Sequence, residues 1–182
     1  MEHLVNRLAA SRIGATYNQY ADSGLRRERL RAYLASHAEA ETVLVGEAAG
    51  YRGARVSGIP FTSERQLTGS GPAESTATIV HRVLAELGLE ESVLLWNVVP
   101  THPGTAASNR RPTRDEVEAG RAFLAEVVRG RRAIAVGRVA ESVLGGPYLR
   151  HPSHGGAGPF AEGLRAAFAT IGPRREVGAA FL

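Results

Sequence analysis

The feature that most constrains the fold is a series of short apolar segments that alternate with segments of helical periodicity. Strands are expected at 42–45, 92–99, 133–136 and 148–150, and helices at 25–36, 79–87, 113–128, 139–144 and 160–169. Such strands need cover on both faces, and a helix between consecutive strands allows them to run parallel. We therefore predict an α/β fold, a three-layer α-β-α sandwich around a four-stranded parallel sheet.

The length of 182 residues fits a single domain spanning 1–182. Within it, residues 1–40 form a helical lead-in and residues 41–182 carry the motifs. The apolar runs are too short for a bilayer, and the N-terminus lacks the pattern of a signal peptide. We therefore expect a cytoplasmic protein that does not bind a membrane.

Two residue types are missing, and each absence excludes a kind of chemistry. The chain has no cysteine, which excludes thiol catalysis, disulfides and cysteine-held zinc or iron–sulfur centres. All 22 basic residues are arginine, so a Schiff base on lysine is also excluded. No histidine pair has metal-ligand spacing, and we predict neither a metal nor a cofactor. The net charge of +4 is compatible with binding nucleic acid.

Polar residues follow the predicted strands at the points where the strands end. Gly46 and Glu47 come after the first strand, Asn97 closes the second, and His151 follows the fourth. Parallel sheets bind their ligands at the carboxyl ends of their strands. We therefore expect these residues, which are far apart in the sequence, to converge on one edge of the sheet.

The same segments, taken together and in order, resemble motifs of the uracil-DNA glycosylase superfamily. They are Gly46-Glu47-Ala48-Ala49-Gly50, Gly58-Ile59-Pro60-Phe61, Asn97-Val98-Val99-Pro100 and His151-Pro152-Ser153. The stretch from Asn109 to Thr113, with Glu116, also resembles the N-R-x-P-T-x-x-E stretch of the bacterial family 4 enzymes. Those enzymes hold an iron–sulfur cluster through four cysteines, so the resemblance is to a cluster-free branch.

The resemblance implies a role for each motif residue. Phe61 would stack on a flipped uracil, and Asn97 would read its hydrogen-bonding edge. His151 would face O2 of the departing base. The remainder of the pocket would be lined by Gly46, Ala48 and Tyr51.

The residue that handles the attacking water is less clearly indicated. Many relatives carry Asp or Asn where this chain has Ala48, and Pro where it has Ala49. Glu47 is then the nearest carboxylate and our candidate catalytic residue beside His151. Glu64 and Tyr51 are the alternatives.

The implied function is that of a monofunctional DNA glycosylase. It would hydrolyse the N-glycosidic bond of a flipped uracil in DNA and release free uracil, acting as a monomer. The predicted DNA contacts are Arg52, Ser153, His154 and Gly155. Two alternatives stay open: a nucleotide-binding regulatory module that uses the glycine loop after the first strand, and a binder of DNA uracil without catalytic activity.

Several other residues are expected outside the site. The arginines between 26 and 31 are predicted to form a solvated helix face, with phosphate contact as the alternative. His37 and His102 are expected at the surface. Residues 155–158 are expected to form a flexible glycine loop, near which Phe160 is the only large side chain that could wedge into a duplex.

Overall fold

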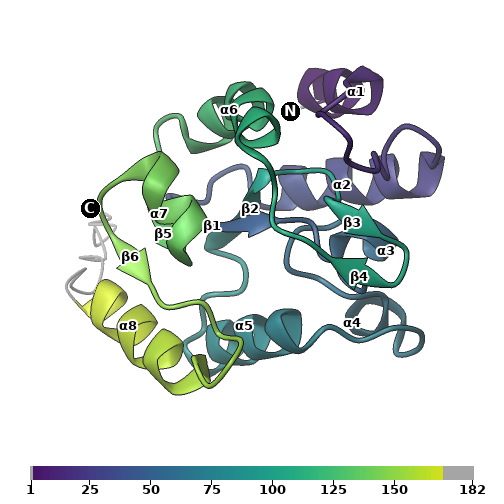
Figure 1. Ribbon diagram of the computed structural model, residues 1–182. Helices are drawn as coiled ribbons and strands as arrows, with labels where there is room; N and C mark the ends of the chain where they lie inside the picture. Colours follow the sequence, from purple (N-terminus) through teal and green to yellow (C-terminus); the bar gives the residue numbers. More distant parts are fainter. Residues whose placement is uncertain (1, 170–182) are drawn as a thin grey trace, which may run out of the picture.

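The structure is a computed structural model that describes residues 2–169 (Figure 1). Its helices are α1 Glu2–Ala10, α2 Gly24–Ser36, α3 Ala54–Ser57, α4 Glu64–Thr68, α5 Ser75–Glu86, α6 Arg114–Val128, α7 Arg138–Leu144 and α8 Ala157–Ala169. Its strands are β1 Thr42–Ala48, β2 Val93–Val99, β3 Gly104–Thr105, β4 Ser108–Asn109, β5 Arg132–Val136 and β6 Tyr148–Leu149.

The central sheet has four parallel strands in the order β2-β1-β5-β6. This confirms the predicted four-stranded parallel sheet and its α/β class. β1 lies in the interior of the sheet, and its register pairs Gly46 with Asn97 of β2. The two residues at the ends of the first two strands are therefore neighbours.

Alternate residues of the strands face two separate cores, as expected for a sheet covered on both sides. Val43 and Val45 face one core and Leu44 faces the other. The first core is completed by α1, α2, α6 and α7, the second by α5 and α8; both layers of helices are visible in Figure 1. The sheet is thus the middle layer of a three-layer sandwich.

Three details differ from the expectations. β1 extends to Ala48, because Ala48 still pairs with Val99. A short antiparallel hairpin, β3–β4, follows β2 and was not predicted. α8 begins at Ala157, so Gly158 lies inside a helix rather than in a flexible loop, and Phe160 is fully buried in the core. Phe160 therefore cannot be a wedge.

The arginines of α2 are bound to the protein itself, so the prediction of a solvated face is wrong for them. Arg29 forms a bidentate ion pair with Glu64, at 2.8 and 3.0 Å. Arg26 donates to the carbonyl of Val56, and Arg27 to the carbonyl of Tyr20. Together with the bond from Arg31 to Asn6, these contacts fix α2 against α1, α3, α4 and the segment that precedes α2.

Among residues 2–169, no helix is both long enough and apolar enough to cross a membrane. The assignment of residues 1–182 to one domain stays a prediction, since its first residue and residues 170–182 lie outside the described part.

Candidate active site

Gly46 is the point at which the ring of Phe61 and the side-chain amide of Asn97 come together. A Cβ atom built on Gly46 would lie 2.3 Å from Cζ of Phe61 and 2.8 Å from Oδ1 of Asn97. Both distances are shorter than any real contact of a Cβ atom, so only glycine fits here. Asn97 is only 3% exposed. Three of the predicted pocket residues therefore meet at the carboxyl end of β1 and β2.

The Asn97 side chain forms no hydrogen bond with any described residue. Within residues 2–169, no backbone group holds the amide in one orientation. Its buried donor and acceptor are thus available to a ligand.

Phe61 is held in an uncommon backbone conformation. Its φ of 53° lies in the left-handed region, which is rare for a bulky residue and costs on the order of 1–3 kcal/mol. The surrounding loop is fixed by hydrogen bonds from the Ser57 hydroxyl to the carbonyls of Ile59 (3.2 Å) and Thr62 (2.6 Å). The Phe61 ring also packs with the second core and is 7% exposed. The ring is thus part of the second core and also lies against Gly46.

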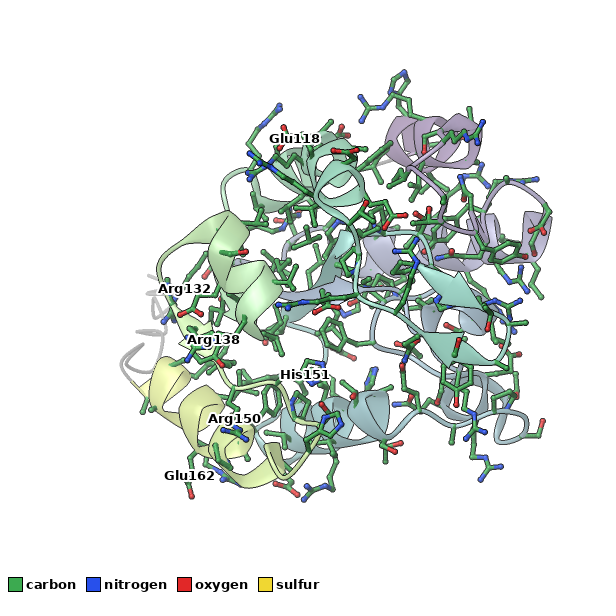
Figure 2. The ribbon with its side chains drawn as sticks, in the orientation of Figure 1. Glu118, Arg132, Arg138, Arg150, His151 and Glu162 are labelled. Atoms are coloured by element: carbon green, nitrogen blue, oxygen red, sulfur yellow. The ribbon has the colours of Figure 1, made fainter. Side chains whose placement is uncertain are left out.

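A cavity of about 330 Å³ lies at the carboxyl edge of the sheet, next to this point. It is lined by Glu47, Ala48, Ala49, Pro103, Asn109, Arg110, His151, Ser153 and His154. Figure 2 shows His151 directed toward the centre of the molecule, whereas the adjacent Arg150 lies over α8. Both predicted catalytic residues, Glu47 and His151, therefore face one cavity, as the order of the strands leads one to expect.

The hydrogen bonds of His151 fix the state of its ring. The backbone N–H of Ser153 donates to Nδ1 at 3.2 Å, and the Ser153 hydroxyl lies 2.8 Å from the same atom. A backbone N–H can only donate, so Nδ1 is the acceptor and the proton is on Nε2. Burial, followed by the nearby His154, lowers the pKa of His151. His151 is thus a neutral imidazole with an N–H donor available to a ligand.

Glu47 is half-buried at the end of β1. Burial raises the pKa of its carboxyl group, and the positive charge of Arg111 partly opposes that effect. Its side chain has no hydrogen-bond partner among the described residues, so it is available to a water molecule.

The two alternatives to Glu47 lie elsewhere. Glu64 is bound to Arg29, away from the cavity. Tyr51 lines a neighbouring cavity of about 210 Å³, together with Arg52, Glu74 and Asn109. Of the three candidates for the water, only Glu47 faces the cavity that contains His151.

Glu74 is a half-buried carboxyl group that the sequence reasoning missed. Its carboxyl oxygens lie 1.9 Å and 2.0 Å from Cβ atoms built on Gly50 and Gly53, so a side chain at either position would displace the carboxyl group. Burial raises its pKa to about 7. The one available signal was the pair of glycines, which indicates close approach by another group but does not say which.

The predicted DNA contacts fall into two groups. Ser153 and His154 line the cavity of Glu47 and His151, and Gly155 follows them in an exposed turn. His154 has a left-handed φ of 51°. Arg52 is exposed and lies over the Tyr51 ring beside the neighbouring cavity. A role in DNA binding stays a prediction for all four.

His102 was expected at the surface, but it is fully buried. Its ring lies between the carbonyl of Ala49 and the carbonyl of Thr105. It therefore connects the loop after β1 with the β3–β4 hairpin. Its position shortly after the end of a strand was the only sequence signal for this role.

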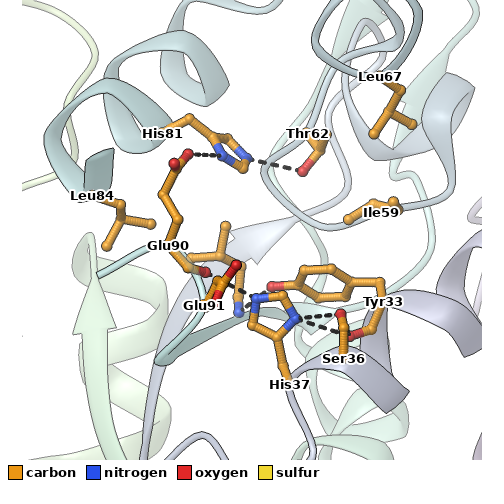
Figure 3. Close-up of a pocket in the computed structure, with 11 residues that line it drawn as sticks. Tyr33, Ser36, His37, Ile59, Thr62, Leu67, His81, Leu84, Glu90 and Glu91 are labelled. Carbon is orange, nitrogen blue, oxygen red and sulfur yellow. Dashed lines mark hydrogen bonds and ion pairs between the residues drawn. The ribbon is translucent and has the colours of Figure 1, made fainter. Parts of the chain in front are cut away.

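A larger cavity, of about 570 Å³, lies away from this edge (Figure 3). It is bordered by Glu90 and Glu91, which precede β2, and by His37. Nδ1 of His37 lies 3.0 Å from the carbonyl oxygen of Tyr33, and Nε2 lies 3.0 Å from that of Glu90. His37 is thus partly buried rather than a free surface residue.

Within residues 2–169, no group of three or more His, Asp or Glu side chains is arranged to hold a metal ion. The fold and the site together define an α/β protein in which an aromatic ring, a buried amide and an imidazole lie at the carboxyl edge of one parallel sheet, with a cavity beside them.

The comparisons with known proteins agree with that class. The sequence model of the Uracil DNA glycosylase superfamily matches residues 34–175. The chain therefore belongs to the uracil-DNA glycosylase superfamily, and this membership supports its classification as a DNA glycosylase, a hydrolase that acts on DNA.

Among solved structures, the chain is similar to wild-type SMUG2 from Pedobacter heparinus, with a TM-score of 0.68 and 14% sequence identity. The match covers 93% of this chain and 97% of the other, so the fold is shared along almost the whole length. No curated protein sequence matches.

Proposed function

We propose that the protein is a monofunctional uracil-DNA glycosylase that flips uracil out of DNA and hydrolyses its N-glycosidic bond. The observation that carries this proposal is the meeting of Phe61 and Asn97 at Gly46, beside the cavity of Glu47 and His151. A base inside a stacked duplex cannot reach such a pocket, so flipping is required.

Recognition would rest on the two groups that meet at Gly46. Stacking on Phe61 contributes about 1–3 kcal/mol with any base. Uracil has a donor at N3 and an acceptor at O4, and the amide of Asn97 complements both. Because Asn97 is only 3% exposed, a base with the reverse pattern would leave buried groups unpaired. Each unpaired group costs about 1–3 kcal/mol.

Catalysis would rest on stabilising the departing uracil anion and on supplying water. The Nε2–H of His151 is a preorganised donor for O2, and one donor of this kind contributes about 2.7–4 kcal/mol in the transition state. A neutral donor suits this role, because it needs no proton from solvent. Glu47, as a carboxylate, would position the water and balance the cationic sugar.

The loop after β1 does not favour the alternative of a nucleotide-binding module. Phosphate cradles leave the glycine amides of such a loop free for the anion. Here the acidic side chain of Glu74 packs against Gly50 and Gly53 and fills that space.

The test is excision from a uracil-containing oligonucleotide, followed by alkali to cleave abasic sites. His151→Ala should lower the single-turnover rate by about 100-fold or more while binding changes little. Glu47→Gln should slow hydrolysis and leave binding almost intact. His3→Ala and Glu118→Gln, at exposed positions of α1 and α6, are the matched controls.

Three outcomes separate the possibilities. Cleavage that depends on His151 supports the proposal. Binding to uracil-containing DNA without cleavage indicates a catalytically silent binder. An unchanged rate in Glu47→Gln would assign the water to another group.

A further inference from the structure

The buried ring of His102 makes two contacts that a neutral imidazole cannot satisfy together. Nδ1 lies 2.7 Å from the carbonyl oxygen of Ala49, and Nε2 lies 2.8 Å from the carbonyl oxygen of Thr105. Both partners are backbone carbonyls, which only accept hydrogen bonds. A neutral ring has one N–H and would turn a lone pair toward the other oxygen. Both contacts are satisfied only when both nitrogens carry protons.

The surroundings hold the ring in this position. The backbones of His102 and Tyr17 pair in both directions, with hydrogen bonds of 2.9 and 3.0 Å. A Cβ atom on Gly104 would lie 2.9 Å from Nε2 of His102, so the glycine makes room for the ring. His102 itself is 0% exposed. Neither contact can therefore be exchanged for a water molecule without a shift of the backbone.

The hairpin that His102 holds also binds the same loop through a second side chain. The backbone N–H of Tyr51 donates to Oδ1 of Asn109 at 2.9 Å. Because that N–H can only donate, the amide of Asn109 has its oxygen toward the loop. Asn109 lines the catalytic cavity together with Glu47.

The base of the hairpin is itself fixed. Arg110 forms a bidentate ion pair with Glu116, at 2.6 and 2.8 Å, and Glu116 caps α6 through the N–H of Thr113. Glu116 is 1% exposed. The hairpin is thus a rigid support, and His102 and Asn109 are the two side chains that join it to the loop after Glu47.

We propose that His102 is a positioning residue of the active site: a buried imidazolium that donates to Ala49 and Thr105 and, with Asn109, holds the loop that follows Glu47 at the end of β1. This proposal rests on the proposed glycosylase function for its kinetic consequence, but not for the charge on the ring. A displacement of catalytic groups by about 1 Å can reduce a rate by about 100-fold. Loss of the His102 contacts or of the Asn109 contact is therefore expected to affect the chemical step and not the affinity for DNA.

The first measurement is independent of activity. Long-range nitrogen–proton NMR spectra of the histidine-labelled full-length protein, at neutral pH, distinguish protonated from unprotonated ring nitrogens. We expect both nitrogens to be protonated in the ring whose signals are missing from the His102→Gln spectrum; this variant distinguishes His102 from His37, whose ring also lies between two backbone carbonyls. A singly protonated His102 would overturn the proposal, even if the protein excises uracil.

The second measurement separates rate from binding. His102→Gln keeps a side-chain N–H donor for one of the two carbonyls. Asn109→Leu removes the oxygen that accepts from the N–H of Tyr51, and Asn109→Asp keeps such an oxygen. We expect about 10- to 100-fold lower single-turnover excision in His102→Gln and Asn109→Leu. Affinity for an oligonucleotide with non-hydrolysable 2′-fluoro-2′-deoxyuridine should change less than about threefold, and Asn109→Asp should recover part of the rate.

Ser108→Ala is the matched control, because Ser108 lies in the same hairpin and bonds only to Thr105 at its exposed end. A wild-type rate in His102→Gln, or an equal loss of rate and affinity, would overturn the positioning role. If the wild-type protein excises no uracil, the proposed function fails, and the NMR result alone decides the state of His102.

Discussion

Replacement of Gly46 by alanine tests the geometry of the proposed base pocket directly. The new Cβ would lie 2.3 Å from Cζ of Phe61 and 2.8 Å from Oδ1 of Asn97. Carbon atoms pack at about 3.5–4.0 Å, so the Phe61 ring must retreat by about 1 Å or more. The ring is packed into the second core and its backbone is already strained, so it has little space into which to move.

The size of the effect follows from these contacts. Overpacking of this kind lowers the free energy of unfolding by about 1–3 kcal/mol. Loss of the stacking surface removes about 1–3 kcal/mol from base binding, and each 1.36 kcal/mol corresponds to a factor of ten in rate. We therefore expect single-turnover excision of uracil to fall by about 10- to 100-fold in Gly46→Ala, with a lower melting temperature.

The assay compares single-turnover excision and thermal unfolding for Gly46→Ala, wild type and Gly158→Ala. Gly158 lies in α8 with no atom within 4 Å of a built Cβ, so the control adds the same methyl group in open space. The control should keep the wild-type rate and equal or slightly higher stability. If Gly46→Ala were folded and excised uracil at the wild-type rate, the base would not bind between Phe61 and Asn97.

Three further predictions concern specificity, pH and metals. Asn97→Asp should lose most uracil excision and gain weak cytosine excision in mild acid, because a buried protonated acid can donate to N3 of cytosine; the ratio of single-turnover rates for the two bases measures this. Glu74 has a folded-state pKa of about 7, raised above 4.5, so the folded state holds a proton that the unfolded state releases. Stability should therefore fall as pH rises from about 4.5 to about 7, and urea titrations of Glu74→Gln should lack that decline. Excision should survive treatment with a chelator, since no cysteine is present to hold a cluster; loss of activity that added metal restores would contradict this.

The sequence was most informative where a single chemical constraint decides the structure. The alternation of short apolar strands with helices predicted the parallel sheet, because such strands need cover on both faces. The order of the strands then brought Glu47, Asn97 and His151 to one edge, since parallel strands share their carboxyl ends. Thr113 and Glu116 predicted the start of α6 by a capping box, and both hydrogen bonds of that box are present.

The sequence was least informative about side chains whose partners come from distant segments. Nothing near His102 shows that its ring meets Ala49 and Thr105, and nothing near Glu74 shows that it packs on two glycines. The arginines of α2 looked solvated because their partners, such as Glu64, lie far along the chain. Such contacts depend on tertiary packing, which local periodicity does not encode.

The short edge strand β6 gives the two halves of the site unequal local stability. In the part of the chain that the structure describes, β6 has two residues that pair with β5 alone, whereas β1, which carries Glu47, pairs on both sides. Short edge elements open more readily than the centre of a sheet. Each opening of β6 would withdraw His151 from the pocket and leave Gly46, Phe61 and Asn97 in place. Under the proposed function, the protein would then have two forms that both hold a base. Only the form with β6 closed would cleave the glycosidic bond. The free energy of opening β6 would set the populations of the two forms.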